Sequence, residues 1–280
     1  MFERRIERPY RVRFDEAGPD GQLRASGYLR FAQDLAWIHS ESAGFGREWY
    51  SARGLTWLVR AIELDVLRDV EYGSALEVST EVIGFRRVWA RRRSEFRPVG
   101  HGDIVGVAIT DWVLLNANGR PVRPPQEILD VFGAEGAFGE FTPMRTQATG
   151  QHRRSVGAGP PSRAAASAAK ESSKAPTIPE SASPREFRPR RSELDPMGHV
   201  NNAAYLDYMD EGFLGLDRIR HGLPAPRRYR AEFLFSAEAG AKVVGRGWDE
   251  GATWNYELTA DERELFRARL ETDPAAWVGG

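Results

Sequence analysis

The sequence predicts an α+β fold made of two tandem copies of one unit. Three observations lead to this prediction. The order strand, turn, helix, strands occurs twice along the 280 residues, the two occurrences align on each other, and a stretch without large apolar residues separates them. We expect one copy over residues 1–132, a flexible linker over 133–186 and a second copy over 187–280.

The first copy opens with a short alternating strand, Tyr10 to Phe14, followed by a dense turn signal, Ala17-Gly18-Pro19-Asp20-Gly21. Apolar residues at helical spacing from Tyr28 to His39 then predict a long helix that ends before Gly44 and Gly46. Only strand patterns follow, and these cover Trp57 to Val66, Ala75 to Ile83, Val88 to Phe96 and Val105 to Leu115.

The linker prediction rests on composition. Pro, Ser, Ala, Gly and Arg dominate residues 142–184, so this stretch cannot bury enough apolar surface to offset its ordering entropy. The second copy then begins at Phe187. It contains a turn, a helix from about Ala203 to Leu214, and four strand patterns, which cover Tyr229 to Phe235, Lys242 to Trp248, Thr253 to Thr259 and Glu264 to Leu270.

The two copies align at an offset of 177 residues around the helix, where Tyr28 matches Tyr205, and at 167 residues further on, where Gly73 matches Gly240. An internal repeat of this length implies two copies of one fold that together mimic a homodimer. The copies differ in their ionisable groups. Asp195 falls opposite Gly18 and His199 opposite Gln22.

The stretch Glu193 to Leu206 is the strongest functional candidate. Asp-Pro-x-Gly is turn chemistry, and Asn201 and Asn202 are good helix N-caps. Asp195 and His199 thus come together at the positive end of a helix. The structural alternative is a turn residue for Asp195 and a solvated or capping residue for His199. The first copy builds such a turn without them, which favours a functional role.

The segment Asp195-Pro196-Met197-Gly198-His199-Val200-Asn201-Asn202 resembles the Asp-x-x-x-His-Val-Asn-Asn signature of thioesterases with the hotdog fold, in which an antiparallel sheet wraps a long central helix. Two tandem copies with the polar set in the second resemble acyl-ACP thioesterases of the plant and bacterial type. The resemblance covers roughly residues 8–132 and 187–270. It implies a double hotdog that hydrolyses fatty acyl thioesters of acyl carrier protein in fatty acid biosynthesis.

Carried over by this resemblance, Asp195 and His199 match the catalytic Asp and His. The family places an Asn two residues after the Asp, where this chain has Met197, and a Glu at the position of Ser236. Glu238 lies two residues further on, on the same face of a regular strand, and is the candidate substitute. The alternative is that Asp195 and His199 activate water alone.

Thioester hydrolysis needs an activated water or nucleophile, a polarised carbonyl and an acyl pocket. His199 is suited to a general base, and Asp195 to orienting it or to direct attack. Backbone N–H groups of Val200, Asn201 and Asn202 are candidates for an oxyanion site. The histidines show no metal-ligand spacing, and we expect no cofactor.

Large apolar residues of the first copy are candidates for the acyl pocket, with core packing as the alternative. By the resemblance, this copy sets the chain length, and we expect Trp57 and Leu58 to line the pocket. Residues Arg86, Arg87, Arg91, Arg92 and Arg93 either attract an acidic carrier protein or form a solvated strand face.

Composition narrows the function classes. The net charge of −1 gives no reason to expect nucleic acid or an anionic membrane as partner, and no stretch has the roughly 20 apolar residues of a membrane span. With no cysteine and no apolar signal region after Met1, we expect a cytoplasmic protein. An acyl-CoA thioesterase and a non-catalytic acyl-binding or scaffolding protein are the alternatives, and a homodimer remains open.

Overall fold

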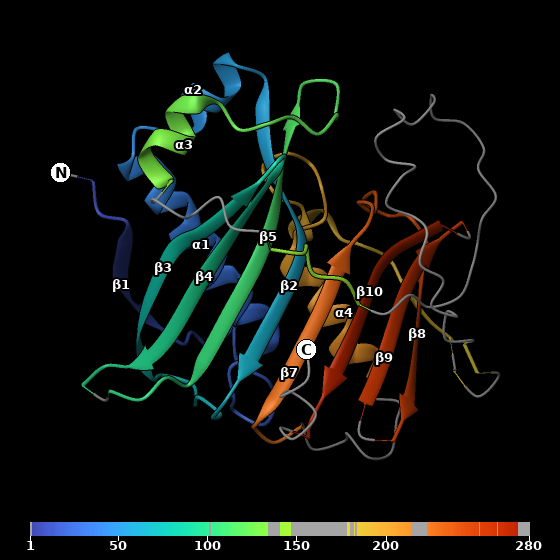
Figure 1. Ribbon diagram of the computed structural model, residues 1–280. Helices are drawn as coiled ribbons and strands as arrows, with labels where there is room; N and C mark the ends of the chain where they lie inside the picture. The colour runs from blue at the N-terminus through green and yellow to red at the C-terminus, as the bar shows by residue number, and fades with distance from the viewer. Residues whose placement is uncertain are drawn as a thin grey trace.

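The computed structural model (Figure 1) describes residues 2–100, 102–133, 141–146, 178–179, 182, 184–213, 223–251, 253–261 and 263–273. The strands are β1 (Arg5–Arg11), β2 (Leu55–Val66), β3 (Ala75–Arg86), β4 (Trp89–Pro98), β5 (Gly106–Asn116), β6 (Pro184–Phe187), β7 (Arg227–Phe233), β8 (Val243–Glu250), β9 (Thr253–Ala260) and β10 (Arg263–Glu271). The helices are α1 (Ala25–Ser42), α2 (Arg47–Ala52), α3 (Gln126–Phe132) and α4 (Asn202–Phe213), with a 3₁₀ turn η1 (Arg191–Glu193).

The ten strands of the described residues form one antiparallel sheet in the order β1-β3-β4-β5-β2-β7-β10-β9-β8-β6. The first five strands in this order belong to the first copy and the last five to the second. The copies join where β2 pairs with β7, with Glu63 opposite Arg230. The predicted α+β double hotdog is confirmed, and its two halves share a continuous sheet.

Strand register confirms the predicted alignment of the copies. Tyr10 pairs with Leu76 in the first copy and Phe187 with Val243 in the second, which reproduces the offsets of 177 and 167 residues. Backbone hydrogen bonds repeat in the same way. The Gly73 N–H donates to Val12 O, and the Gly240 N–H donates to Pro189 O.

Helices α1 and α4 lie on one face of the sheet, behind it in Figure 1, whereas α2 and α3 cover one end. The apolar faces of α1 and α4 and the inward side chains of the strands form one core. Between the helices, Arg30 Nη2 donates to Asp207 Oδ2 at 2.7 Å. These two residues are themselves 177 positions apart, so the pseudo-two-fold relation passes through both the helix pair and the β2–β7 junction.

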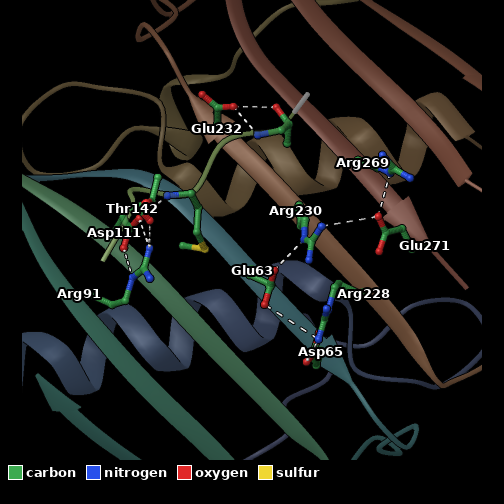
Figure 2. Close-up of polar contacts among 12 residues, drawn as sticks. Glu63, Asp65, Arg91, Asp111, Thr142, Arg228, Arg230, Glu232, Arg269 and Glu271 are labelled. Carbon is green, nitrogen blue, oxygen red and sulfur yellow. Dashed lines mark hydrogen bonds and ion pairs between the residues drawn. The ribbon is translucent and has the colours of Figure 1, made fainter. Parts of the chain in front are cut away.

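The opposite face of the sheet is charged, and ion pairs cross the junction between the copies (Figure 2). Arg228 donates to Asp65 at 2.5 and 2.7 Å, and Arg230 donates to Glu63 at 2.7 Å. Each such ion pair contributes little to the free energy of folding. A shift in the register of β2 and β7 would place like charges opposite each other, so the pairs favour the observed register.

The expected linker lies mostly outside the described residues. One described part of it, residues 141–146, crosses the charged face, where the Met144 N–H donates to Asp111 Oδ2 and the Thr146 N–H to Glu232 Oε1. Its last residues, from Pro184, belong to β6. The opening strand was predicted too late, at Tyr10 to Phe14. The strand Arg5–Arg11 is an edge strand whose mostly charged, exposed side chains give no alternating signal.

Candidate active site

The segment from Leu194 to Val200 forms a tight turn in front of α4. Leu194 and Val200 form an isolated bridge, and the Asp195 N–H donates to His199 O at 2.7 Å. The Gly198 N–H donates to Asp195 O at 2.9 Å, with Gly198 at φ +80°. Only glycine adopts this conformation at no steric cost, which explains the Asp-Pro-x-Gly sequence.

The Asp195 carboxylate belongs to this turn and also faces a cavity. Its Oδ1 accepts from the Met197 N–H at 2.9 Å and from the His199 N–H at 3.0 Å. Among the described residues, Oδ2 has no hydrogen-bond donor, and Asp195 lines the cavity described below. One oxygen therefore fixes the carboxylate, and the other accepts no hydrogen bond from the described residues.

The start of α4 is capped by Asn201, whose Oδ1 accepts from the Ala203 N–H at 2.9 Å. The Asn201 N–H donates to Glu193 O at 2.8 Å, so it is not free to bind an oxyanion. The prediction that the Asn201 N–H belongs to an oxyanion site is wrong. This N–H belongs to the antiparallel bridge of Leu194 and Val200, where it bonds the residue before Leu194. The Asn202 N–H lies in the first turn, where helix N–H groups lack an acceptor one turn earlier, and Asn202 lines the cavity.

His199 is exposed and does not line the cavity. It meets Asp195 through backbone hydrogen bonds. Ser236 and Glu238 are also exposed, and β7 ends at Phe233, so both lie in a loop. The expectation that they share a face of a regular strand is wrong. In the first copy, the counterparts of His199 and Glu238 are Gln22 and Glu71. The backbones of these two residues form an isolated antiparallel β-bridge.

Tyr205 is a residue of this site that sequence reasoning treated only as part of a helix face. Its hydroxyl oxygen accepts from the Ala237 N–H at 2.8 Å, which fixes the loop of Ser236 and Glu238 to α4. Burial first, and the nearby Asp195 carboxylate as well, raise the pKa of the Tyr205 hydroxyl. Tyr205 comes four residues, or about one helical turn, after the N-cap Asn201. This spacing places it on the same side of α4 as the turn and could have indicated its position from the sequence.

A cavity of about 600 Å³ opens beside Asp195. The second copy contributes only one wall of it, from the turn and the start of α4. The first copy supplies all the other lining residues, from α1, α2, α3 and strands β2 to β5. The volume is that of a typical small-molecule site.

Trp57 and Leu58 both line this cavity, next to Trp112 and Phe85. Trp57 Nε1 donates to Tyr50 Oη at 3.1 Å, which fixes the indole ring at the wall. Helices α2 and α3, which close this end of the sheet, were not predicted. They are six and seven residues long, too short for a clear helical period.

Of the five arginines considered above, Arg86 and Arg87 are exposed, whereas Arg91, Arg92 and Arg93 lie on β4 and each contacts a partner side chain. Arg91 makes two hydrogen bonds to Asp111, at 2.7 and 2.8 Å, and Arg93 Nε donates to Glu95 at 2.9 Å. Arg92 is buried. Burial acts to raise the pKa of Glu95, but hydrogen bonds from Arg5, Arg97 and Arg93 prevail and lower it to about 2.

Within the described ranges, no cluster of three or more acidic or histidine side chains could hold a metal ion. No described helix is long and apolar enough to span a membrane.

Comparison with known proteins gives consistent matches. Residues 3–132 match the acyl-ACP thioesterase N-terminal domain, and residues 177–221 match the acyl-ACP thioesterase C-terminal domain. Oleoyl-acyl carrier protein thioesterase 1, chloroplastic, of Arabidopsis thaliana is 22% identical over 211 residues, which are 71% of this chain and 52% of the relative. The corresponding protein of Coriandrum sativum is 23% identical over 206 residues. The chain thus spans about half the length of the curated relatives it matches.

Solved structures show the same fold over nearly the whole chain. The 12:0-ACP thioesterase from Umbellularia californica superposes with a TM-score of 0.71 at 20% identity, covering 97% of this chain and 98% of that one. An acyl-ACP thioesterase from Bacteroides thetaiotaomicron gives a TM-score of 0.69 at 15% identity, covering 96% and 97%.

Proposed function

Because this chain belongs to the acyl-ACP thioesterase family, we propose that it hydrolyses fatty acyl-ACP to free fatty acid and holo-ACP in fatty acid biosynthesis. One observation supports this most directly. The Asp195 carboxylate, held by two backbone N–H groups, stands at a cavity of about 600 Å³ lined mostly by apolar side chains. A fatty acyl chain fits such a cavity, and its thioester would then lie beside the carboxylate.

In the proposed reaction, Asp195 Oδ2 takes a proton from water as the water oxygen attacks the thioester carbon. The alternative is that Oδ2 attacks the carbon itself and water then cleaves the resulting anhydride. The Asn202 N–H at the positive end of α4 stabilises the developing oxyanion. The C–S bond breaks, and the leaving thiolate takes a proton.

His199 has the role of proton donor to that thiolate in this proposal. Its exposed position outside the cavity suits a thiol that leaves toward solvent, where the carrier protein would lie. Glu238 is proposed as its orienting partner. The counterparts of these two residues form a backbone β-bridge in the first copy, and this pairing places the two positions side by side. Both roles are separable from that of Asp195 by mutation.

The central experiment measures free fatty acid released from acyl-ACP and from acyl-CoA of the same chain length. Release from acyl-ACP by the wild type is the expected result. Release from neither thioester would leave the non-catalytic acyl-binding alternative, whereas release from acyl-CoA alone would favour the acyl-CoA thioesterase.

A salt titration of both activities tests carrier docking. An electrostatic contribution from the acidic carrier would make the acyl-ACP rate fall more steeply with salt than the acyl-CoA rate. Arg93 of β4 is ion-paired with Glu95, so Arg93→Met should leave this difference in slope unchanged. A loss of the difference in that variant would return the carrier-binding role to β4.

Chain-length selection is assigned to the cavity wall. Replacing Trp57 or Leu58 by a smaller residue should lengthen the preferred acyl chain, because the cavity grows at that point. The product profile from a mixed acyl-ACP pool measures this shift, and an unchanged profile would contradict it.

Localisation and assembly remain predictions. The plant relatives are named chloroplastic, and we propose a cytoplasmic protein for this chain, as expected from its sequence. The internal pseudo-dimer supplies both parts of the site within one chain, so a homodimer is not needed to complete it.

A further inference from the structure

Arg92 is a buried cation in the wall of the acyl cavity. It lies on β4, its exposed fraction is 8%, and it lines the cavity together with Ser40, Tyr50 and Trp57. A guanidinium group is unusual in a pocket for a hydrocarbon chain, because a buried charge is costly unless it is paired.

Among the described residues, the hydrogen bonds of Arg92 use only one of its three nitrogens. Nη1 donates to His39 Nδ1 at 2.9 Å and lies 3.4 Å from Thr80 Oγ1. His39 Nε2 in turn donates to Glu3 O at 2.9 Å, which assigns the proton to Nε2 and leaves Nδ1 as an acceptor. Burial, and then the charge of Arg92, lower the pKa of His39 to about 4, so the histidine is neutral near neutral pH.

No carboxylate pairs with Arg92 among the described residues. Other interior arginines do have such partners: Arg227 pairs with Asp69, and Arg91 with Asp111. Burial lowers the pKa of Arg92 to about 10, which still leaves it charged near neutral pH. The cavity wall therefore contains a positive charge that no acidic side chain of the described chain balances.

The neighbouring polar groups are already satisfied. Ser40 Oγ donates to Phe45 O at 2.9 Å, and Tyr50 Oη contacts both Ser40 Oγ and Trp57 Nε1 at 3.1 Å. A guanidinium has five N–H donors. Nε and Nη2 of Arg92 have no acceptor among the described residues, so these donors are left for whatever occupies the cavity.

We propose that Arg92 donates hydrogen bonds to an oxygen atom on the acyl group, so that the preferred substrate is an oxygen-bearing acyl chain and not the plain hydrocarbon chain of equal length. This inference rests on the proposed thioesterase function and specifies its substrate class. The oxygen is a hydroxyl, a keto group or a carboxylate away from the thioester. A plain hydrocarbon chain would displace water from Arg92 and offer no hydrogen-bond acceptor in its place. An oxygen atom on the chain would accept the hydrogen bonds that the water had accepted.

The test compares acyl-ACP pairs of one chain length, plain against hydroxylated, with the hydroxyl moved along the chain, and adds one substrate with a distal carboxylate. We expect kcat/KM to peak for one oxygen position, at least about tenfold above the plain chain. A peak for the hydroxyl or for the carboxylate identifies which acceptor is used. If no oxygenated chain is preferred by the wild type, the proposal is overturned, whatever the variants do.

Arg92→Met should abolish the peak, so that the ratio of kcat/KM for the oxygenated and plain chains falls to about one. Arg93→Met is the matched control, because Arg93 is the next residue on β4, contacts Glu95 and does not line the cavity. It should retain the peak. A peak that survives in Arg92→Met, or disappears equally in both variants, overturns the assignment.

Binding of the free acids separates this inference from the proposed hydrolysis. Trp37, Trp57 and Trp112 line the cavity, so their fluorescence reports occupation by a fatty acid without any turnover. Tighter binding of the oxygenated acid by the wild type, lost in Arg92→Met, supports the inference even if no thioester is cleaved. Hydrolysis without this preference supports the enzyme and refutes the role of Arg92.

Discussion

The turns at residues 18–22 and 195–199 have the same backbone and place their carboxylates differently. The Gly18 N–H donates to Gln22 O at 2.8 Å, and the Asp195 N–H donates to His199 O at 2.7 Å. Gly21 and Gly198 are both at positive φ, +76° and +80°. Each turn also uses one aspartate to accept from the N–H of its last residue, Gln22 or His199.

The difference lies in which position supplies that aspartate. The first turn uses Asp20, at its third position, and a side chain at Gly18 would meet Asp20 Oδ1 at 2.8 Å. The second turn uses Asp195, at its first position, and has Met197 at the third. Asp20 is exposed, whereas Asp195 lines the cavity. The turn needs one carboxylate, and its placement at the first position directs that carboxylate to the cavity.

The first copy is therefore a natural control for a purely structural role of Asp195. It also supplies most of the cavity, while the second copy supplies the carboxylate. Neither copy alone contains both. The four predictions below each compare a group of one copy with a group of the other.

The largest effect is expected for Asp195→Asn. The amide oxygen can still accept from Met197 and His199, so the turn persists, but the proposed base or nucleophile is lost. We expect kcat to fall about a thousandfold with little change in thermal unfolding. Asp20→Asn, the counterpart, should keep near wild-type activity. Equal activity of the two variants would show that Asp195 is only a turn residue.

A smaller effect is expected for His199→Ala, about a hundredfold in kcat, because it removes the proposed proton donor but leaves the carboxylate in place. Gln22→Ala is the control, since Gln22 occupies the same place in the first turn. Equal kcat of the wild type and His199→Ala would exclude this role.

His39 in the first copy and Asp210 in the second should change the free energy of unfolding in opposite directions as the pH falls. The folded state holds the pKa of His39 at about 4, below its ordinary 6.5, so His39 withdraws stability as the pH falls between these values. Burial and then Asp207 raise the pKa of Asp210 from 3.8 to about 7, so Asp210 adds stability as the pH falls through that window.

Asp210→Asn should therefore expose the His39 effect. Its free energy of unfolding should drop by about 2 kcal/mol between pH 6.5 and 4 relative to the wild type. Denaturant unfolding at a series of pH values measures this. His39→Gln in the same background should remove the drop, and a drop that persists would assign it to another group.

The smallest effect concerns the glycines of the two turns. Gly21→Ala and Gly198→Ala each force a side chain into positive φ, and a Cβ at either position meets nothing within 4 Å. Both should cost about 1 kcal/mol of unfolding free energy. Only Gly198→Ala should also lower kcat, because it disturbs the turn that fixes Asp195. Clearly unequal stability costs would mean that the turns are not equivalent.

The sequence alone determined the features that depend on residues close together in the chain. Turn residues, helix caps and alternating strands depend on neighbours in the chain, so the duplication, its two offsets, the β-rich layout and the turn of Asp195 were predictable. Edge strand β1, short helices α2 and α3, and the loop after Phe233 lack such local signals and were missed or misplaced.

Only the tertiary structure decided what each side chain faces. The β2–β7 junction joins the copies, and it places a carboxylate of the second copy beside a cavity of the first. Five arginines in one stretch looked alike in sequence. The alternation of β4 directs Arg91 and Arg93 to carboxylates and Arg92 into the cavity wall. Partners across a sheet are set by register and burial, which no short window of sequence contains.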